Sequence, residues 1–298
     1  YPDKNDIALA RRLFGDKDIF DKAYDIYLFA NLDHGASGIY RMLRKRNRHI
    51  RAIMFEDGYA SYSGWYSDFL TMYGSIPYDG NLYKRLILKT WFHRLVDNVF
   101  CHVEKILVFN PSIMTYKPSF RVESMKPIDV KNSELVEIYN RIFKYDPSVD
   151  SYKEPIIFFE ESYYADGCNV NDVDIVEKIA SIVGKEKLFV KTHPRNPENR
   201  FKKLGYKTNK NTSIPWEVIC MNIDLGEKTL ITIASVAAIV PATMLGKKYN
   251  GILLMKMIPD DSCLKKNITN LYEKMCEEHS SLHLVKTMQE LEECISKK

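Results

Sequence analysis

The chain has 298 residues, of which 45% are hydrophobic and 28% charged, a balance typical of a globular protein with a sizeable core. This length predicts one large domain or two domains of roughly 150 residues each. The formal net charge of only +4, with basic residues spread along the chain, argues against a nucleic-acid-binding module, and no apolar run approaches the roughly 18 residues of a transmembrane helix.

Three short apolar strands are predicted in the first half of the chain, each rich in β-branched or aromatic residues. They are expected at residues 25–30, 49–55 and 105–109. A helix that carries Ile39, Tyr40 and Leu43 is expected after the first strand. The sequence begins at Tyr1 rather than at Met, which is compatible with a trimmed chain that lacks an earlier strand.

A further helix is predicted at residues 83–100, where basic residues are mixed with large apolar ones. These residues are Lys84, Arg85, Lys89, His93 and Arg94, with Leu86, Leu88, Trp91, Phe92 and Leu95. Such a helix can rest on a membrane surface and meet a lipid-linked acceptor, bury one face in the core, or contact a second copy of the chain in a homodimer. The sequence leaves these alternatives open.

Strands and helices alternate in the second half of the chain as well. The strands are expected at residues 155–159, 187–191, 229–233 and 251–255, and the helices at residues 173–183, 235–245 and 282–295. This alternation predicts an α/β fold with parallel sheets covered by helices on both faces. The pattern breaks between Asp146 and Asp150, so we expect an N-terminal domain at residues 1–150 and a C-terminal domain at residues 151–298, with a closing C-terminal helix.

Six cysteines are scattered along the chain without a CxxC pair. They are Cys101, Cys168, Cys220, Cys263, Cys276 and Cys294. Their spacing fits no zinc motif, and a chain of this size does not need disulfides. We therefore expect reduced thiols in a cytoplasmic protein.

The candidate site residues are the polar residues that follow each strand, because ligands of open parallel sheets bind beyond the carboxyl ends of the strands. Glu56, Asp57 and Gly58 follow the strand at residues 49–55. Two carboxylates at this place can supply a general base in a cleft. The alternative is a simple turn, because Asp-Gly is a frequent turn dipeptide.

His193 follows the strand at residues 187–191 and can donate a hydrogen bond or a proton to a phosphate. Lys191 and Arg195 add positive charge on either side of it. Pro194 biases the backbone of His193 towards an extended conformation, which holds the direction of the imidazole. A strand-terminating His-Pro turn without a ligand is the alternative.

Two further positions fit a nucleotide site. Ser235, flanked by Ala234 and Val236, is expected at the N-terminus of a helix, where it binds phosphate or serves only as the helix cap. Glu217, two residues after Pro215, can accept hydrogen bonds from ribose hydroxyls or simply stand in the first turn of a helix. No single motif is specific, but their order along the chain is.

The ordered motifs resemble those of bacterial sialyltransferases. The motifs are Glu56-Asp57-Gly58, His193-Pro194, Pro215-Trp216-Glu217 and Ser235. Within that group the chain is most similar to the lipooligosaccharide sialyltransferases, with the capsular polysialyltransferases as more distant relatives. The resemblance spans about residues 25–255 and implies the GT-B fold, two Rossmann-like domains with a cleft between them.

The resemblance also implies an inverting transfer of sialic acid from CMP-sialic acid to a sugar hydroxyl. In this reaction His193 would hydrogen-bond or protonate the leaving CMP phosphate, Ser235 would bind that phosphate, and Glu217 would bind the ribose. The resemblance implies no metal and no other cofactor, because the phosphate already carries the leaving charge. No DxD motif follows a strand, since Asp172-Val173-Asp174 stands on a predicted helix.

The base that removes the proton of the acceptor hydroxyl has two candidate positions. The polysialyl relatives keep theirs after an N-terminal strand, where this chain has Glu56 and Asp57, whereas the lipooligosaccharide enzymes are similar in placing it where Asp166 stands. We expect Asp166 to be the base and the other two carboxylates to bind the acceptor or support the cleft. The chain departs from many relatives after Ser235, where Val236-Ala237-Ala238 carries no further hydroxyl, so backbone N–H groups must bind more of the phosphate.

The implied partners are CMP-sialic acid and a glycan acceptor with a terminal galactose-type sugar. The implied product is a capsule or lipooligosaccharide glycan, made in the cytoplasm at the inner face of the cell membrane. Two alternatives remain: a glycosyltransferase of the same fold that uses another donor such as CMP-Kdo or a UDP-sugar, and a non-catalytic nucleotide-sugar-binding protein. Comparing the binding of CMP and UDP separates the donors, and CMP binding without transfer would indicate the non-catalytic protein.

Overall fold

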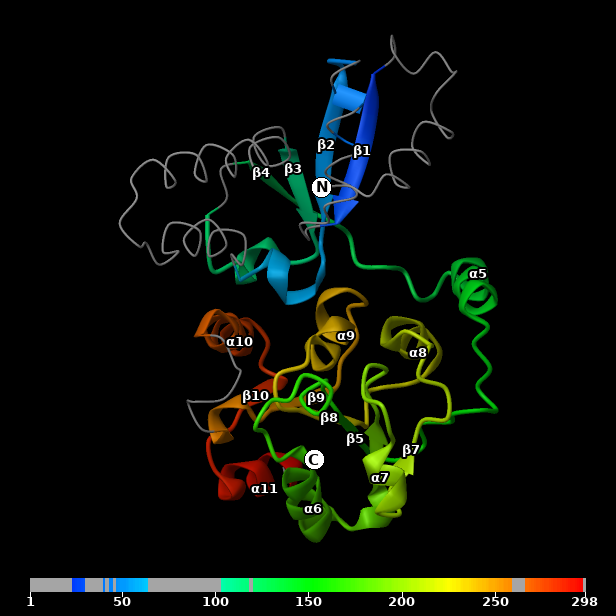
Figure 1. Ribbon diagram of the computed structural model, residues 1–298, viewed down its shortest axis with the longest axis vertical. Coiled ribbons are helices and arrows are strands. Elements are labelled where there is room, and N and C mark those ends of the chain that lie inside the picture. The colour runs from blue at the N-terminus through cyan, green and yellow to red at the C-terminus, as the bar shows by residue number, and fades with distance from the viewer. Residues whose placement is uncertain are drawn as a thin grey trace. The chain divides into compact units, whose positions relative to one another are not determined.

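The chain forms two compact units, Tyr1–Met125 and Lys126–Lys298. The computed structural model describes residues 23–29, 40, 43–44, 47–63, 103–117, 120–258 and 266–296. Each unit is built on a parallel sheet (Figure 1). The predicted α/β class, with two Rossmann-like domains, is confirmed.

The first unit holds a four-stranded sheet in the order β1-β2-β3-β4. The strands are β1 (Tyr24–Phe29), β2 (Ile50–Phe55), β3 (Val103–Val108) and β4 (Arg121–Ser124). In the inner strand β2, Ala52, Ile53 and Met54 are buried in succession, as in a strand that is covered on both faces. The three strands predicted in this half of the chain are confirmed to within two residues at each end, and Tyr40 and Leu43 are buried helical residues.

The second unit holds a six-stranded parallel sheet in the order β10-β9-β8-β5-β6-β7. The strands are β5 (Ile156–Phe159), β6 (Leu188–Lys191), β7 (Lys207–Thr208), β8 (Thr229–Thr232), β9 (Asn250–Leu253) and β10 (Leu282–Leu284). From β5 the chain runs outward through β6 and β7, returns to the other side of β5, and runs outward again through β8, β9 and β10. In this Rossmann-type order, ligands bind beyond the carboxyl ends of β5 and β8, where the direction of winding reverses.

Helices cover both faces of the sheet in the second unit. They are α5 (Ser133–Phe143), α6 (Asp172–Val183), α7 (Arg200–Lys203), α8 (Trp216–Asn222), α9 (Val240–Thr243), α10 (Lys266–Glu278) and α11 (Met288–Ser296). Figure 1 shows α6 and α7 on one side of this sheet and α8, α9 and α10 on the other. The Asn171 side chain caps α6, as expected for a helix that begins at the predicted place.

The helix predicted at residues 235–245 is wrong in its extent. A single 3-10 turn (η4, Val236–Ala238) is followed by one α-helical turn, α9. Pro241 lies in the first turn of α9, where its missing N–H is tolerated, but a helix cannot run through it from Ser235. Ser235 therefore precedes only a single 3-10 turn, so the dipole of a long helix that the sequence predicted behind it is absent.

The helix predicted at residues 282–295 is also wrong in its first part. Leu282–Leu284 forms β10, which pairs in parallel with β9, and α11 begins only at Met288. The prediction failed because amphipathic periodicity within the segment carries no information about β9. The edge of β9 offers backbone hydrogen bonds to Leu282–Leu284, and these residues become extended to pair with it. The side-chain amide of Asn250 donates to the carbonyl of Cys294 at 3.2 Å, so α11 contacts its own unit.

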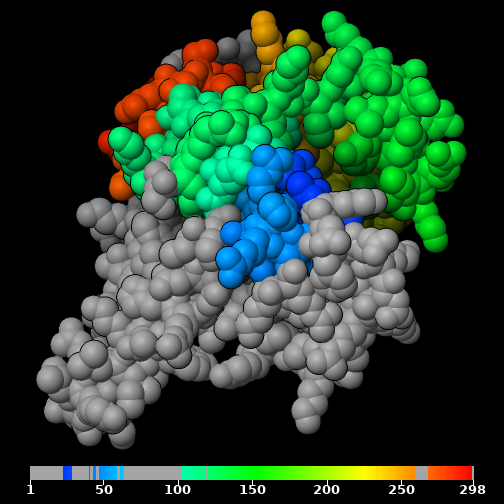
Figure 2. Space-filling view, turned by 90° about the horizontal axis from the view of Figure 1, so that it is seen from above, coloured from blue at the N-terminus to red at the C-terminus, as the bar shows by residue number. Residues whose placement is uncertain are grey.

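The two units divide at Met125, ahead of the domain boundary predicted near residue 150. The intervening residues make hydrogen bonds within the second unit. The Ile128 N–H donates to the carbonyl of Met244 at 2.9 Å, and the side-chain amides of Asn140 and Asn222 exchange hydrogen bonds of 2.8 and 2.7 Å. The hydrogen bonds between Asn140 and Asn222 join α5 to α8, and Figure 2 shows this part of the chain among the green atoms at the molecular surface.

The expectation of six reduced thiols is wrong for Cys168, which is disulfide-bonded. Cys220, Cys276 and Cys294 are free thiols. Cysteine spacing by itself does not determine which cysteines are bridged, so the sequence did not reveal this disulfide. The prediction of a cytoplasmic protein loses the support that reduced thiols gave it.

The basic, aromatic helix predicted at residues 83–100 lies outside the described residues. Its contact with a membrane or with a second copy of the chain therefore stays a prediction. In the part of the chain that the structure describes, no helix is long and apolar enough to cross a membrane.

Candidate active site

Three neighbouring strands of the second unit deliver polar residues to one edge of the sheet. Glu160 and Glu161 follow β5, His193 follows β6 on one side of it, and Ser235 follows β8 on the other side. Because all three strands are parallel, their carboxyl ends meet at the same edge, where the strand order reverses. The predicted His193 and Ser235 are thus brought to the two sides of β5.

The backbone around His193 fixes the protonation of its ring. The ring Nδ1 accepts a hydrogen bond from the Arg195 N–H at 3.2 Å, so in the neutral imidazole the proton resides on Nε2. Burial lowers the pKa of His193, and the positive charges of Arg195 and Lys191 lower it further, whereas Asp166 opposes them. At neutral pH the ring therefore offers an uncharged Nε2–H donor, and a bound anion would favour its protonation.

Asp166 forms a two-point ion pair with Arg195. The guanidinium nitrogens lie 3.0 and 3.1 Å from the two carboxylate oxygens, and the Ser162 hydroxyl donates to one of these oxygens at 2.7 Å. The pair is open to solvent, with side-chain exposures of 40% for Asp166 and 62% for Arg195. Both oxygens of this predicted base are thus occupied by donors in the structure.

Ser235 caps the 3-10 turn η4. Its Oγ accepts from the Ala237 N–H at 3.2 Å, while its own N–H donates to Thr232 Oγ1 at 3.0 Å. The Ala234 N–H is also in use, since it donates to Glu161, whereas the Val236 N–H forms no hydrogen bond with any described residue. The Ser235 hydroxyl hydrogen and the Val236 N–H are therefore the donors that this turn can offer to a ligand.

Lys191 ends β6 and interacts electrostatically with Glu217, without an ion pair between them. Burial lowers the pKa of Lys191, and the Glu217 carboxylate opposes that shift. Glu217 stands in the first turn of α8 after Pro215, and the neighbouring Trp216 packs edge-on against Phe159 with ring centroids 4.8 Å apart. The predicted roles of Lys191 as a positive charge beside His193 and of Glu217 as a ligand of the ribose stay predictions.

In the first unit, Glu56 and Asp57 follow β2 and have different surroundings. Glu56 Oε2 accepts from the Phe109 N–H at 2.8 Å and from the Tyr62 hydroxyl, and burial raises the pKa of Glu56. The Asp57 N–H donates to Ser61 Oγ at 2.7 Å, but no described residue donates to its carboxylate. Glu56 joins the ends of β2 and β3, and Asp57 is left available.

Residues 17–245, more than half of the chain, match the family model described as alpha-2,8-polysialyltransferase (POLYST). The chain belongs to this family. It is a glycosyltransferase of the sialyltransferase class, which confirms the resemblance to bacterial sialyltransferases, and the matching group within them is the polysialyltransferases.

A solved structure of similar fold is an alpha/beta-galactoside alpha-2,3-sialyltransferase from the luminous marine bacterium Photobacterium phosphoreum. The TM-score is 0.57 at 11% identity, over 97% of this chain and 85% of that one. The spinosyn forosaminyltransferase SpnP also matches, with a TM-score of 0.48 at 11% identity, over 92% of this chain and 66% of that one. No curated protein matches the chain. The likeness to the Photobacterium enzyme supports the GT-B fold of this polysialyltransferase-family chain.

Sequence reasoning missed the two carboxylates that follow β5. Glu160 and Glu161 stand directly after the buried apolar strand Ile156–Phe159, in the same position relative to their strand as Glu56 and Asp57. The signal of two acids at a strand end was therefore visible in the sequence. It drew no attention because these acids belong to none of the motifs that carried the resemblance.

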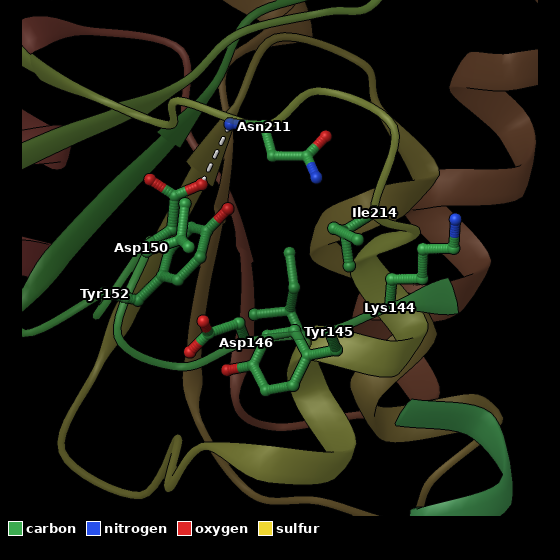
Figure 3. A pocket seen from close by; sticks show the side chains of 9 residues that line it. Lys144, Tyr145, Asp146, Asp150, Tyr152, Asn211 and Ile214 are labelled. Carbon is green, nitrogen blue, oxygen red and sulfur yellow. Dashed lines mark hydrogen bonds between the residues drawn. The ribbon is translucent and has the colours of Figure 1, made fainter. Parts of the chain in front are cut away.

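A small cavity of about 30 Å³ lies beside α8 in the second unit of this sialyltransferase. Its lining residues are Lys144, Tyr145, Asp146, Val149, Asp150, Tyr152, Asn211, Ile214 and Ile219. Figure 3 shows the Asp150 carboxylate bonded to the backbone of Asn211, at 3.0 Å, on one side of the cavity. None of the predicted site residues lines it.

No group of three or more His, Cys, Asp or Glu side chains that could hold a metal ion occurs among the described residues. The structure describes every predicted site residue. It brings Asp166, His193 and Arg195 into hydrogen-bonding contact and places Ser235 at the same edge of the sheet, after β8. Among the described residues, no hydrogen bond or ion pair joins the side chains of Lys191 or Glu217 to them.

Proposed function

We propose that the chain transfers sialic acid from CMP-sialic acid to a hydroxyl of a glycan acceptor, with inversion at the anomeric carbon. The observation that carries this proposal is the placement of His193 and Ser235 after β6 and β8, on either side of β5, in a member of a sialyltransferase family. This is the place where nucleotides bind in sheets of this order.

In the proposed donor complex, three hydrogens point to the CMP phosphate. They are the His193 Nε2–H, the Ser235 hydroxyl hydrogen and the Val236 N–H, and Arg195 supplies positive charge nearby. As the bond between phosphate and sugar breaks, negative charge grows on the leaving phosphate, and His193 stabilises it by donating its proton or a hydrogen bond. Glu217, after Pro215, binds the ribose hydroxyls, while Ala234 shapes the turn that holds Ser235.

We assign the base to Asp57 rather than to Asp166. A general base needs an oxygen that can accept the proton of the acceptor hydroxyl. Both oxygens of Asp166 accept from Arg195 and one also accepts from Ser162, so an acceptor hydroxyl would compete with these donors. The Asp57 carboxylate accepts from no described residue. Asp166 then serves to hold Arg195, and Glu56 to hold the strand ends around Asp57. This assignment reverses the expectation from the sequence.

The acceptor follows from the family. Because the family description names an alpha-2,8 linkage between sialic acids, the first acceptor to test is an oligosaccharide that ends in sialic acid. A galactose-terminated acceptor is the alternative that the sequence predicted. The transfer is proposed to need no divalent metal, since the phosphate leaves already charged and protein donors stabilise it.

The test is a transfer assay with CMP-sialic acid, a sialylated and a galactose-terminated oligosaccharide, and EDTA throughout. We expect product with at least one acceptor, and calorimetry should show binding of CMP and none of UDP. Product that appears only after a divalent metal is added would contradict the metal-independent mechanism. Binding of UDP in place of CMP would contradict the donor assignment, and CMP binding without donor hydrolysis or transfer would contradict catalysis.

A further inference from the structure

Two consecutive acids stand at the end of β5, at the centre of the donor side of the sheet. The neighbours of β5 are β6, which leads to His193, and β8, which leads to Ser235. Consecutive residues of an extended chain point to opposite sides, so Glu160 and Glu161 can each reach a different neighbour. Their hydrogen bonds show that they do.

Glu161 holds the turn after β8. Its Oε1 accepts from the Ala234 N–H and from the Thr232 hydroxyl at 3.2 Å, and Thr232 Oγ1 in turn accepts from the Ser235 N–H at 3.0 Å. One carboxylate oxygen thereby fixes the backbone on the N-terminal side of Ser235, directly through Ala234 and indirectly through Thr232.

Glu160 holds the turn after β6 in the same manner. Its Oε2 accepts from the His193 N–H at 3.0 Å, and its Oε1 accepts from Arg200 at 2.8 Å. Arg200 also donates to Asp172 at 2.7 Å, and its guanidinium lies over the Tyr164 ring, 4.5 Å from the centroid. The side chains of Glu160 and Asp172 are 0% and 1% exposed, so two buried carboxylates share one cation.

A gain in stability alone does not account for these buried acids. Buried carboxylates lose hydration, and apolar side chains of similar size often stabilise a fold as well as a buried ion pair does. Burial raises the pKa of Glu161 to about 7, which reflects the same cost. What apolar side chains could not supply is an acceptor for the N–H groups of His193 and Ala234.

We propose that Glu160 and Glu161 are positioning residues of the donor site, which hold His193 and Ser235 at the spacing that one phosphate requires. The inference rests on the proposed function, because it assigns a purpose to the placement of those two residues. It also explains which donors remain: the acids occupy the N–H groups of His193 and Ala234, so the phosphate is left with Nε2–H, the Ser235 hydroxyl and the Val236 N–H.

The test of Glu161 compares Glu161→Gln with Glu161→Leu. Glutamine keeps a carbonyl oxygen that can accept from the Ala234 N–H, whereas leucine keeps the volume and loses the acceptor. Titration calorimetry with CMP should give an affinity within about 3-fold of wild type for the glutamine variant and about 10- to 100-fold weaker for the leucine variant, the equivalent of one charged hydrogen bond. Glu292→Gln, on the exposed face of α11, is the matched control for loss of a charge.

A milder variant covers the case in which Glu161→Leu does not fold. Thr232→Val keeps the shape of the side chain but breaks the link from the Ser235 N–H to Glu161. We expect about 3- to 10-fold weaker CMP binding. Faster amide hydrogen exchange is expected in the peptide that contains Ser235.

The test of Glu160 compares Glu160→Gln with Asp172→Asn. Each removes one negative charge beside Arg200, but only Glu160 also accepts from His193. In Glu160→Gln the carbonyl oxygen should turn to the guanidinium, which leaves an NH2 group facing the His193 N–H. We expect kcat/KM and CMP affinity to fall about 10-fold or more in Glu160→Gln and less than about 3-fold in Asp172→Asn.

Equal CMP affinities in wild type and folded Glu161→Leu and Thr232→Val would overturn the positioning role of Glu161. Equal losses in Glu160→Gln and Asp172→Asn would overturn that of Glu160, because the effect would then be one of charge beside Arg200. A wild-type protein that binds no CMP would instead refute the proposed function, so the two failures are distinguishable.

Discussion

Each unit of the molecule places a pair of acids directly after a buried inner strand, and the two pairs are used differently. After β2 the Glu56 N–H donates to the carbonyl of Leu107 at 2.9 Å, and after β5 the Glu160 N–H donates to that of Lys191 at 3.0 Å. In both places the first acid then accepts the N–H of a residue just beyond the neighbouring strand, Phe109 in one unit and His193 in the other. The first acid of each pair thus hydrogen-bonds the end of its own strand to the segment that follows the neighbouring strand. We call this arrangement, at Glu56 and at Glu160, a clamp.

The second acid of each pair is where the units diverge. Glu161 is long enough to reach the Ala234 N–H after β8, whereas the shorter Asp57 receives no hydrogen bond from a described residue. Gly58, with a φ of +52°, turns the chain immediately after Asp57 into a 3-10 helix. The same pattern of two acids at a strand end therefore has two outcomes. In the second unit both acids hold neighbouring segments, whereas in the first unit one acid does so and the other carboxylate stays available.

The largest expected effect concerns that available carboxylate. Asp57→Asn should lower kcat by about 10²- to 10⁴-fold, because a base can no longer take the acceptor proton. CMP affinity should stay near that of wild type, since the assigned phosphate donors are elsewhere. Steady-state kinetics and calorimetry measure the two quantities. If Asp166→Asn loses as much kcat while Asp57→Asn stays active, the roles of the two acids must be exchanged.

The second-largest effect on catalysis is expected at His193, whose N–H donates to Glu160 in the second unit. His193→Asn removes the Nε2–H that the clamp positions, and it should lower kcat/KM about 10²-fold. The variant should also bind CMP more weakly than wild type, which separates it from Asp57→Asn. A His193→Asn enzyme with the kinetics of wild type would show that the clamp holds this loop for a structural reason alone.

The raised pKa of Glu161 predicts a pH-dependent contribution to stability. The folded carboxyl titrates near pH 7 rather than near its ordinary 4.5, so the folded state binds the proton more tightly than the unfolded state does. The contribution of this carboxyl to the free energy of unfolding should be largest below pH 4.5, fall as the pH rises towards 7, and be nearly absent above that pH.

Glu161→Gln has no such proton, so the stability of the variant relative to wild type should rise by about 1–3 kcal/mol between pH 5 and pH 8. Urea unfolding at both pH values measures it, with Glu292→Gln as the control. A difference that does not change with pH would mean that this carboxyl is not protonated in the folded state at pH 5.

The last prediction concerns Glu56, the first-unit clamp, and an effect of similar size on the free energy of unfolding. Glu56→Leu leaves the Phe109 N–H and the Tyr62 hydroxyl without their acceptor and should lower the free energy of unfolding by about 1–3 kcal/mol. Glu56→Gln keeps an acceptor and should lose less than half of that. Equal losses in the two variants would indicate that the charge of Glu56, and not its acceptor oxygen, is what stabilises the strand ends.

The strands and the motif order were readable from the sequence. Buried parallel strands need continuous apolar runs, so the strands that the structure has at Ile50–Phe55 and Ile156–Phe159 were predicted to within a residue. The ordered motifs carried the sialyltransferase resemblance, which the family match confirms. These features are local, because a strand or a motif is written in a few consecutive residues.

Only the tertiary structure decided which residues act on one another. Two features depend on a partner far along the chain or in a neighbouring strand. They are the ion pair of Asp166 with Arg195 and the β10 strand at Leu282–Leu284. The hydrogen bond from the His193 N–H to the Glu160 carboxylate spans 33 residues and exists because β5 and β6 lie side by side. Side-chain partners follow strand order, and strand order is a property of the folded chain.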